Sequence, residues 1–330
     1  MENNPKNFMN VKEKIKILKI KIGEAVKAKS EKRLWKAVRR RLVPKFWKRL
    51  TNAKHYRALA KENEADVSFV VSHQSENYFG INLPVMKIDG KGKFIFPQGT
   101  KRVMIDVGTA PNWPNSIEWL NRHPEDSVVI GIEPNIDSWC VTKAMYFFAA
   151  QLEREPDLLK DIPSRGYVKQ EHVNRIFFIP AAVGNFQGYS LFNSNQSVGT
   201  SSLLDSNVKD ALHLQLQKNL VPVIMLKEII KRMPENIPYV EHLKIDAQGF
   251  DYEIVKSAGD SLKKCAVVSV EICAQNEYAH SYIAKDMINY IAAQGFKEIP
   301  GTEEHEHGTA SFINLECVDT LSALDYKLRN

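Results

Sequence analysis

The stretch VMIDVGTAPNWPNS, residues 103–116, is the most informative for the fold. Four apolar residues and Asp106 lead into Gly108, as they do where a parallel strand ends beside a bound nucleotide. The later glycines of a G-x-G-x-x-G turn are missing, and Ala110 and Asn112 stand in that region. Asn115, followed by Glu118, fits a helix N-cap with its capping-box partner. The stretch therefore predicts a strand, a long turn with one required glycine, and a capped helix.

Strands and helices alternate along the chain after this unit. Runs of apolar residues without polar alternation predict strands at 127–134, 175–184, 242–249, 265–273 and 311–317, and a strand that runs into a helix at 221–233. Helical periodicity predicts helices at 138–155, 251–259 and 284–296. Buried strands that alternate with helices indicate a mostly parallel sheet that is covered on both faces. We therefore expect one doubly wound α/β domain.

Two regions precede this domain. Residues 66–72 and 84–97 look like strands, the second pair joined by a DGKGK turn, so we expect a small hairpin region. Residues 1–60 hold 19 Lys and Arg against 4 Asp and Glu, whereas the rest of the chain holds 26 against 35. We therefore divide the chain into a basic helical arm (1–61), a β-rich lead-in (62–100), the α/β domain (101–318) and a tail (319–330).

The basic arm has one apolar helical stripe, and tryptophan and phenylalanine follow where its arginines cluster. Such a segment can lie on an anionic membrane surface, pack on the domain or a partner, or bind nucleic-acid phosphates. Residues 10–50 are the candidate membrane contact, and nucleic acid is the weaker alternative because the domain is acidic. No apolar run reaches the length of a membrane span, and no secretory signal is evident. The four cysteines form no CxxC pair, which favours reduced thiols and a cytoplasmic location, with peripheral attachment at the inner membrane face as an option.

Acidic residues end several predicted strands, where ligands bind in an open α/β sheet. Glu133 follows Gly108 by 25 residues, the position from which an acid holds both ribose hydroxyls of a nucleotide. A dinucleotide needs further glycines around its pyrophosphate, but S-adenosylmethionine has no phosphate and tolerates a longer turn. Its cationic amino group can be attracted by Asp106. The strand ends therefore favour S-adenosylmethionine over NAD.

Several motifs also occur in the order found in one known family: VMIDVG, GIEPN, IPAAVGNFQGYSLF, GTSSLL, VPVIMLKEI, LKIDAQGFDYEIVKSAG and VVSVEI. Over residues 100–315 the chain resembles the FkbM-type methyltransferases. The resemblance implies a class I Rossmann-like fold and S-adenosylmethionine-dependent O-methyl transfer. The chain differs from the family pattern in two places: the turn reads DVGTAPN in place of DVGANxG, and Gln248 stands where glutamate is usual.

The resemblance also assigns roles to residues of this chain. It implies that Asp106 and Gly108 form the cofactor turn, that Glu133 binds the ribose, and that Asp246 lies beside the transferred methyl group. We expect the neighbouring strand-end residues Thr109, Asn135 and Ala182 to contact the cofactor as well.

Three residues are candidates for the chemistry. Asp246 is best placed to take or orient the acceptor's proton, with capping of the helix after it as the alternative. Glu271 and His280, around the loop after the strand at 265–273, are secondary candidates. The EEHEH cluster at 303–307 fits exposed charge better than metal ligation, and we expect no metal.

The sequence thus predicts an S-adenosylmethionine-dependent O-methyltransferase. By the family resemblance, its acceptor is a hydroxyl of a sugar, a glycan or a related small metabolite. Two alternatives remain: a ribose methyltransferase that clamps RNA with the basic arm, and a non-catalytic scaffold of the same fold at the membrane.

Overall fold

The computed structural model describes the chain in several segments. They are residues 77–78, 81–82, 86–109, 114–135, 174–194, 200–205, 207, 217–273, 278, 282, 284–300 and 307–317. The predictions for the basic arm, the strand at 66–72, the helix at 138–155 and the C-terminal tail lie outside these residues. Within them, no helix has the length and hydropathy to span a bilayer.

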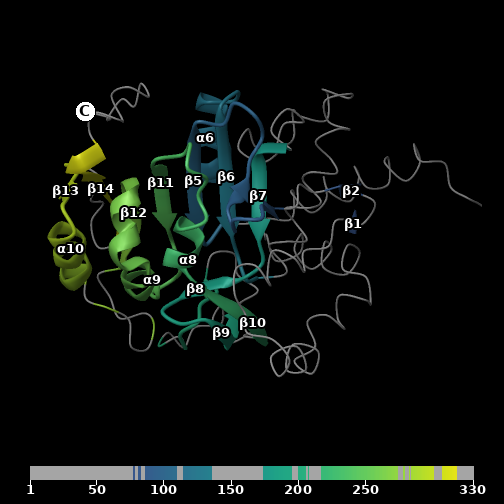
Figure 1. Ribbon diagram of the computed structural model, residues 1–330. Helices are drawn as coiled ribbons and strands as arrows, with labels where there is room; N and C mark the ends of the chain where they lie inside the picture. Colours follow the sequence, from purple (N-terminus) through teal and green to yellow (C-terminus); the bar gives the residue numbers. More distant parts are fainter. Residues whose placement is uncertain are drawn as a thin grey trace, which may run out of the picture. The chain divides into compact units, whose positions relative to one another are not determined.

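The centre of the fold is a sheet of seven strands in the order β13-β14-β12-β11-β5-β6-β7 (Figure 1). Its strands are β5 (Arg102–Val107), β6 (Ser127–Ile132), β7 (Ile176–Ile179), β11 (Val240–Ile245), β12 (Cys265–Cys273), β13 (Phe296–Glu298) and β14 (His307–Asn314). Strand β14 is antiparallel to both of its neighbours, and the other pairs are parallel. The order reverses between β5 and β11, which is the switch point where α/β sheets bind ligands. The predicted mostly parallel α/β sheet is confirmed.

Helices cover both faces of this sheet. The main apolar core lies between one face and α8 (Leu226–Ile230), α9 (Asp251–Ala258) and α10 (Ala284–Ala293). On the other face, α6 (Pro114–Arg122) buries Ile117, Trp119 and Leu120 against Met104, Val129 and Ile176. Every residue of β5 and β6 is buried. Each large apolar side chain buried in this way contributes about 1.5–3 kcal/mol, which explains why these strands carry no polar alternation.

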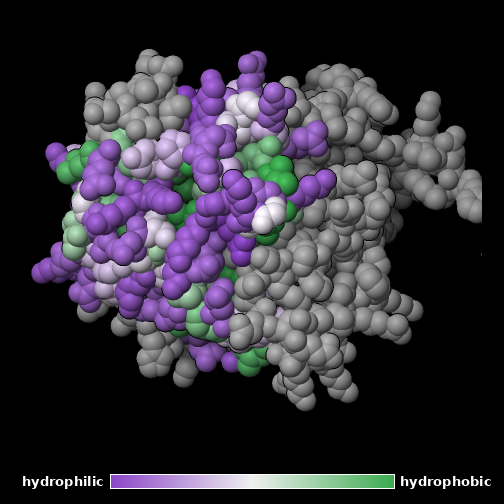
Figure 2. Space-filling model, in the orientation of Figure 1, coloured by the Kyte–Doolittle hydropathy of each residue, from purple (hydrophilic) through white to green (hydrophobic). Residues whose placement is uncertain are grey.

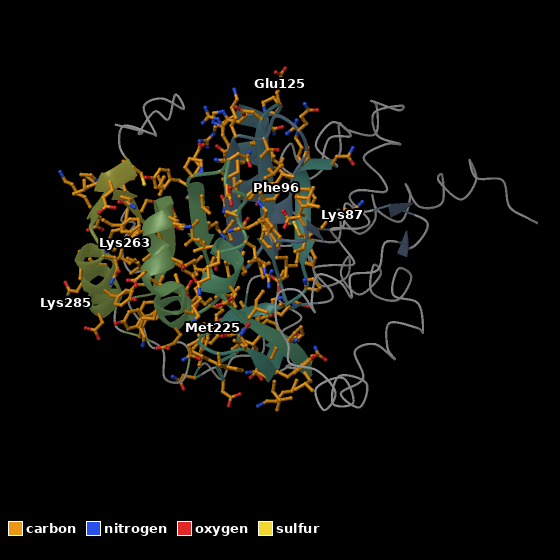
Figure 3. All side chains as sticks on the ribbon, viewed as in Figure 1. Lys87, Phe96, Glu125, Met225, Lys263 and Lys285 are labelled. Carbon is orange, nitrogen blue, oxygen red and sulfur yellow. The ribbon has the colours of Figure 1, made fainter. Side chains whose placement is uncertain are left out.

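A second, smaller sheet was not predicted. The segment at 175–184, expected as one strand, is divided at Pro180 into β7 of the large sheet and β8 (Ala182–Gly184) of the small one. Strand β10 (Gln217–Met225) pairs in parallel with β8 and antiparallel with β9 (Gly188–Ser194). In Figure 3, Glu125, just before β6, is labelled at the top of the view, and Met225, at the end of β10, is labelled in its lower part. The small sheet therefore lies near the carboxyl ends of the parallel strands.

Two further details correct the sequence-based boundaries. Helix α6 begins at Pro114, so Asn115 is a helical residue and not the predicted N-cap. Proline is favoured at the first helical position because its missing N–H would have no partner there. Glu118, the predicted capping-box partner, instead forms an ion pair of 2.7 Å with Arg122. The last strand, predicted at 311–317, begins at His307 and gives way after Asn314 to the 3₁₀ turn η4 (Leu315–Cys317).

The remaining elements are short. The hairpin predicted around DGKGK is present as β3 (Lys87–Ile88) and β4 (Phe94–Ile95), and β1 (Asn77–Tyr78) pairs with β2 (Ile81–Asn82). A 3₁₀ turn, η3 (Gly259–Lys264), joins α9 to β12. In the view of Figure 2 the coloured surface is mostly hydrophilic. Cys265 and Cys317 are buried free thiols.

Candidate functional site

Gly108 directly follows β5 and lies beside Asp246, the residue that directly follows β11. Its φ is +76°, and a Cβ built on it would lie 1.8 Å from the backbone oxygen of Asp246. The amide of Asp246 donates to the oxygen of Val107 at 3.0 Å, and the amide of Gly108 donates to the oxygen of Ile132 at 3.0 Å. The one glycine of the turn is therefore required by strand packing, because the end of β11 passes directly over it.

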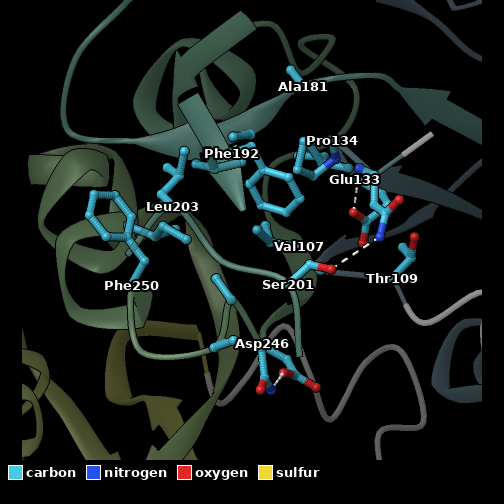
Figure 4. Close-up of a pocket in the computed structure, with 18 residues that line it drawn as sticks. Val107, Thr109, Glu133, Pro134, Ala181, Phe192, Ser201, Leu203, Asp246 and Phe250 are labelled. Atoms are coloured by element: carbon cyan, nitrogen blue, oxygen red, sulfur yellow. Dashed lines mark hydrogen bonds between the residues drawn. The ribbon is translucent and has the colours of Figure 1, made fainter. Parts of the chain in front are cut away.

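A cavity opens at these strand ends (Figure 4). Its walls come from β5 and β6 of the large sheet, from the turn after β11 and the start of α9, from β8 and β9 of the small sheet, and from the segment around Ser201. Apolar side chains form much of the lining: Val107, Ile132, Pro134, Ala181, Ala182, Val183, Phe192, Leu203, Phe250 and Ile254. Polar side chains enter at Thr109, Glu133, Asn135, Ser201, Asp246 and Gln248. Five of the six predicted cofactor residues thus lie in one cavity wall.

Glu133 is the most strongly perturbed acid of this lining. Its side chain is buried, and its Oε1 accepts a hydrogen bond of 2.7 Å from the amide of Asn135. Burial raises the pKa of Glu133 to about 8, against the opposing effect of that hydrogen bond. The side-chain amide of Asn135 in turn donates to Ser201 Oγ at 3.1 Å. The segment EPN therefore fixes a carboxyl group at the end of β6 that gains from hydroxyl donors.

Thr109 adds a second polar group. Its side chain is 1% exposed, and within the described segments its Oγ1 has no hydrogen-bond partner. Buried hydroxyls are normally paired, so an unpaired one in a cavity lining fits a site built for a polar ligand. Together, Thr109, Glu133 and the apolar walls suit a nucleoside, because its ribose hydroxyls can donate to the acid and its flat base can pack against the apolar side chains. The donor set fits S-adenosylmethionine.

Asp106 is the one predicted cofactor residue outside the lining. Its carboxylate is 2% exposed and accepts hydrogen bonds from Ser116 Oγ on α6 and from Lys244 Nζ at 3.3 Å. Lys244 also reaches Asp246 Oδ2 at 3.4 Å. Burial by itself lowers the pKa of Lys244, but the carboxylates of Asp106 and Asp246 outweigh it and raise that pKa above its ordinary value. Lys244 therefore stays charged and connects the ends of β5 and β11.

Asp246 and Glu271, two predicted catalytic residues, are brought together at the edge of the cavity. The side-chain amide of Gln248 donates to Asp246 Oδ1 and to Glu271 Oε2, each at 3.0 Å. Burial and the charge of Asp246 raise the pKa of Glu271 well above its ordinary value. The Asp246 side chain is 38% exposed, so a second substrate can reach it.

The alternative role of Asp246, capping α9, is not observed, and the turn before this helix is held by another acid. Asp251 is fully buried and accepts the amides of Ala247 and Gly249 at 2.9 and 3.1 Å. Helix α9 has no side-chain cap at its N-cap residue, Phe250. The carboxylate of Asp246 instead faces Lys244 and Gln248, on the side of the cavity.

Some predicted residues lie outside this arrangement. His280 and His305 are not among the described residues, and His307 is the first residue of β14. In the described segments no group of three His, Cys, Asp or Glu residues is placed to hold a metal ion. Sequence reasoning missed Lys244, although a lysine two residues before Asp246 in a buried strand must share its face.

The pKa of Glu133 makes a prediction about stability. The folded state keeps a proton that the unfolded chain loses near pH 4.5, so the contribution of Glu133 is fully present below pH 4.5 and is lost as pH rises to about 8. Glu133→Gln removes this loss. The difference in free energy of unfolding between this variant and the unmodified chain should therefore grow in favour of the variant, by up to about 1.4 kcal/mol per pH unit between pH 4.5 and 8. Urea unfolding at pH 5, 6.5 and 8 measures this difference, and parallel curves at all three pH values would contradict it.

Comparison with known proteins gives one family and several distant structures. The family model for the methyltransferase FkbM domain matches residues 106–298. No curated protein sequence matches the chain. Among solved structures, FkbM methyltransferase from Methylobacillus flagellatus KT is similar at 13% identity and a TM-score of 0.36, over 64% of this chain and 43% of that one. Magnesium protoporphyrin IX methyltransferase (ChlM) from Synechocystis PCC 6803, solved with bound SAM, is similar at 7% identity and a TM-score of 0.30, over 66% of this chain and 72% of that one. TrmK from M. capricolum, solved with S-adenosylhomocysteine, is similar at 10% identity and a TM-score of 0.27, over 67% of this chain and 65% of that one.

Proposed function

The chain belongs to the FkbM methyltransferase domain family, which confirms the predicted family, enzyme class and S-adenosylmethionine cofactor, and on that premise we propose an O-methyltransferase. Its acceptor is a hydroxyl of a sugar, a glycan or a related small metabolite. The observation that carries the proposal is one cavity that contains both a buried acid, Glu133, and an accessible one, Asp246. The two acids suit different tasks, the first binding and the second chemistry.

The cofactor half of the cavity is the part near β6 and β8. Glu133 would accept the two ribose hydroxyls, and the apolar side chains around Ala182 and Phe192 would enclose the adenine ring. Thr109 Oγ1 would find a partner on the polar amino-acid end. When bound, S-adenosylmethionine supplies an electrophilic methyl group on a sulfonium. Asp106 contributes indirectly, because its carboxylate holds Lys244.

The acceptor half begins at Asp246. A hydroxyl oxygen that takes a methyl group must lose its proton, and a carboxylate at its side can accept that proton or orient it. Lys244 Nζ lies 3.4 Å from Asp246 Oδ2 and holds that carboxylate beside the cavity. Burial and the charge of Asp246 raise the pKa of Glu271, so Glu271 keeps its own proton.

A direct test of cofactor binding uses Glu133→Ala. Loss of the carboxyl group that accepts the ribose hydroxyls should weaken the binding of S-adenosylmethionine and S-adenosylhomocysteine by about 1–3 kcal/mol. Titration calorimetry of the full chain measures this. Glu125→Ala, which removes an exposed acid at the far end of β6, is the matched control and should bind like the unmodified chain. If the unmodified chain binds neither compound at millimolar concentration, the scaffold alternative replaces the enzyme.

The class of acceptor is tested with S-adenosylmethionine labelled in its methyl group. The full chain is incubated with free monosaccharides, nucleotide-activated sugars or total RNA, and the label is followed into each. We expect label in a sugar as a base-stable ether. Label in RNA alone would support the clamp alternative, which the acidic composition of residues 61–330 disfavours.

We also propose that residues 10–50 attach the enzyme to an anionic membrane surface. The apolar stripe of this arm is narrow and surrounded by lysines, so it can bury only a modest apolar area. Attraction to the headgroups, at about 1 kcal/mol per basic residue near the surface, therefore has to supply much of the binding. The full chain should sediment with anionic vesicles, not with neutral ones, and should be released near 1 M salt, where the Debye length is about 3 Å. Sedimentation that ignores lipid charge or salt would overturn this prediction.

A further inference from the structure

Gln248 lies at the centre of the polar network beside the cavity. Its Nε2 atom carries two hydrogens, and it donates one to Asp246 and one to Glu271, both at 3.0 Å. One amide group thus joins a residue at the end of β11 to a residue in β12. No donor is left over, and both acceptors are carboxyl groups that repel each other when ionised.

The orientation of this amide is fixed by its other contacts. The hydroxyl of Tyr278, which is 3% exposed, lies 3.0 Å from Gln248 Oε1 and 3.4 Å from the backbone oxygen of Thr200, and donates to Gln248 Oε1 at the shorter distance. In the reverse orientation, Oε1 would face the carboxyl groups of Asp246 and Glu271. The only hydrogen that it could then accept is a proton held by one of those groups. Ser202 Oγ donates to the backbone oxygen of Gln248 at 2.8 Å. At Gly249 a Cβ would lie 2.9 Å from the Tyr278 ring, so this glycine lets the ring lie close to the turn.

The backbone at Gln248 is strained. Its φ is +54°, and in the described part of the chain it is the only residue other than glycine with a positive φ. The left-handed region is unfavourable for a residue with a side chain. Glycine would avoid this cost, as it does next in the chain at Gly249. A side chain retained in such a conformation points to a role for the side chain itself.

We infer that Gln248 is a positioning residue, whose amide holds the carboxyl groups of Asp246 and Glu271 as a pair with Asp246 presented to the acceptor. The inference rests on the proposed function. Each N–H of the amide offsets the repulsion within the pair, so the pair ionises more readily than it would without them. Other charged groups also act here: Lys244 lowers the pKa of Glu271 and Asp251 raises it, and the charge of Asp246 also raises the pKa of Glu133.

The test follows the protonation of the pair in the full chain without any ligand. Aspartate and glutamate are labelled with ¹³C at the carboxyl carbon, and the resonances that vanish in Asp246→Asn and Glu271→Gln identify the two groups. Gln248→Met keeps the length of the side chain but removes both donors, and Gln248→Glu keeps the shape and adds a charge. Both variants should raise the titration midpoints of the pair by about one pH unit or more, with the larger shift for glutamate.

The matched control is Gln294→Met, a glutamine-to-methionine change just after α10, which should leave the midpoints unchanged. Midpoints within about 0.3 pH units of the original in both Gln248 variants would overturn the inference, because a purely structural side chain would give that result. If one variant fails to fold, the other decides. Calorimetry with S-adenosylmethionine on the unmodified chain is run in parallel. Absent binding there refutes the proposed function, whereas the titration midpoints test Gln248 separately.

Discussion

Gly108→Ala is expected to unfold the switch point or to destabilise the chain by more than about 4 kcal/mol, a size that few single substitutions reach. The new Cβ would lie 1.8 Å from the backbone oxygen of Asp246, and backbone atoms of two central strands cannot separate cheaply. Relief would require β5 and β11 to move apart at their ends, which disrupts the wall that carries Thr109 and Asp246. Urea unfolding and cofactor titration measure the two consequences.

The matched control is Gly295→Ala. Gly295 has a φ of +92°, but no described atom lies within 4 Å of the position that its Cβ would take, so its variant carries only the cost of the left-handed backbone. That cost is about 1–2 kcal/mol, and cofactor affinity should not change. Equal destabilisation by the two variants would mean that the close approach of β11 to Gly108 contributes nothing beyond backbone strain.

The sequence predicted best those features that short-range patterns determine. Largely apolar runs identified β5, β6 and β12, because a strand covered on both faces has little room for polar side chains. Glu133 and Asp246 were found because ligands bind where parallel strands end, and the end of a strand is visible in the sequence. Both acids line the same cavity. Their roles remain proposals.

Features that depend on distant parts of the chain were not predicted. The three-stranded sheet brings 182–184 beside 223–225, and nothing in either segment names the other as its partner. Asp106 was read as a cofactor ligand from its place before Gly108, but its neighbour Lys244 lies 138 residues further along the chain. The contact between Gln248 and Tyr278 was missed for the same reason. Register across strands and the packing of loops decide these pairs, and periodicity contains neither.

Asp246→Asn is expected to lower turnover by roughly 10²–10⁴-fold, the usual contribution of a positioned acid–base group. The loss corresponds to about 2.7–5.5 kcal/mol in the barrier. Asparagine keeps the shape of the side chain and can still accept from Gln248, but it takes up no proton and does not pair with Lys244 as a charge. The rate is measured with labelled S-adenosylmethionine and whichever hydroxyl acceptor takes up the label.

The fold and the cofactor site should survive this substitution. Lys244 keeps its ion pair with Asp106, and the amides of the turn after β11 are held by Asp251 and not by Asp246. Cofactor affinity should therefore change by less than about threefold, so that the loss is one of transition-state stabilisation. Asp260→Asn, a change of the same kind at an exposed acid after α9, should retain full turnover. An unchanged rate in Asp246→Asn would remove Asp246 from the chemistry, and Glu271, the other half of the pair, would then be the acid to vary.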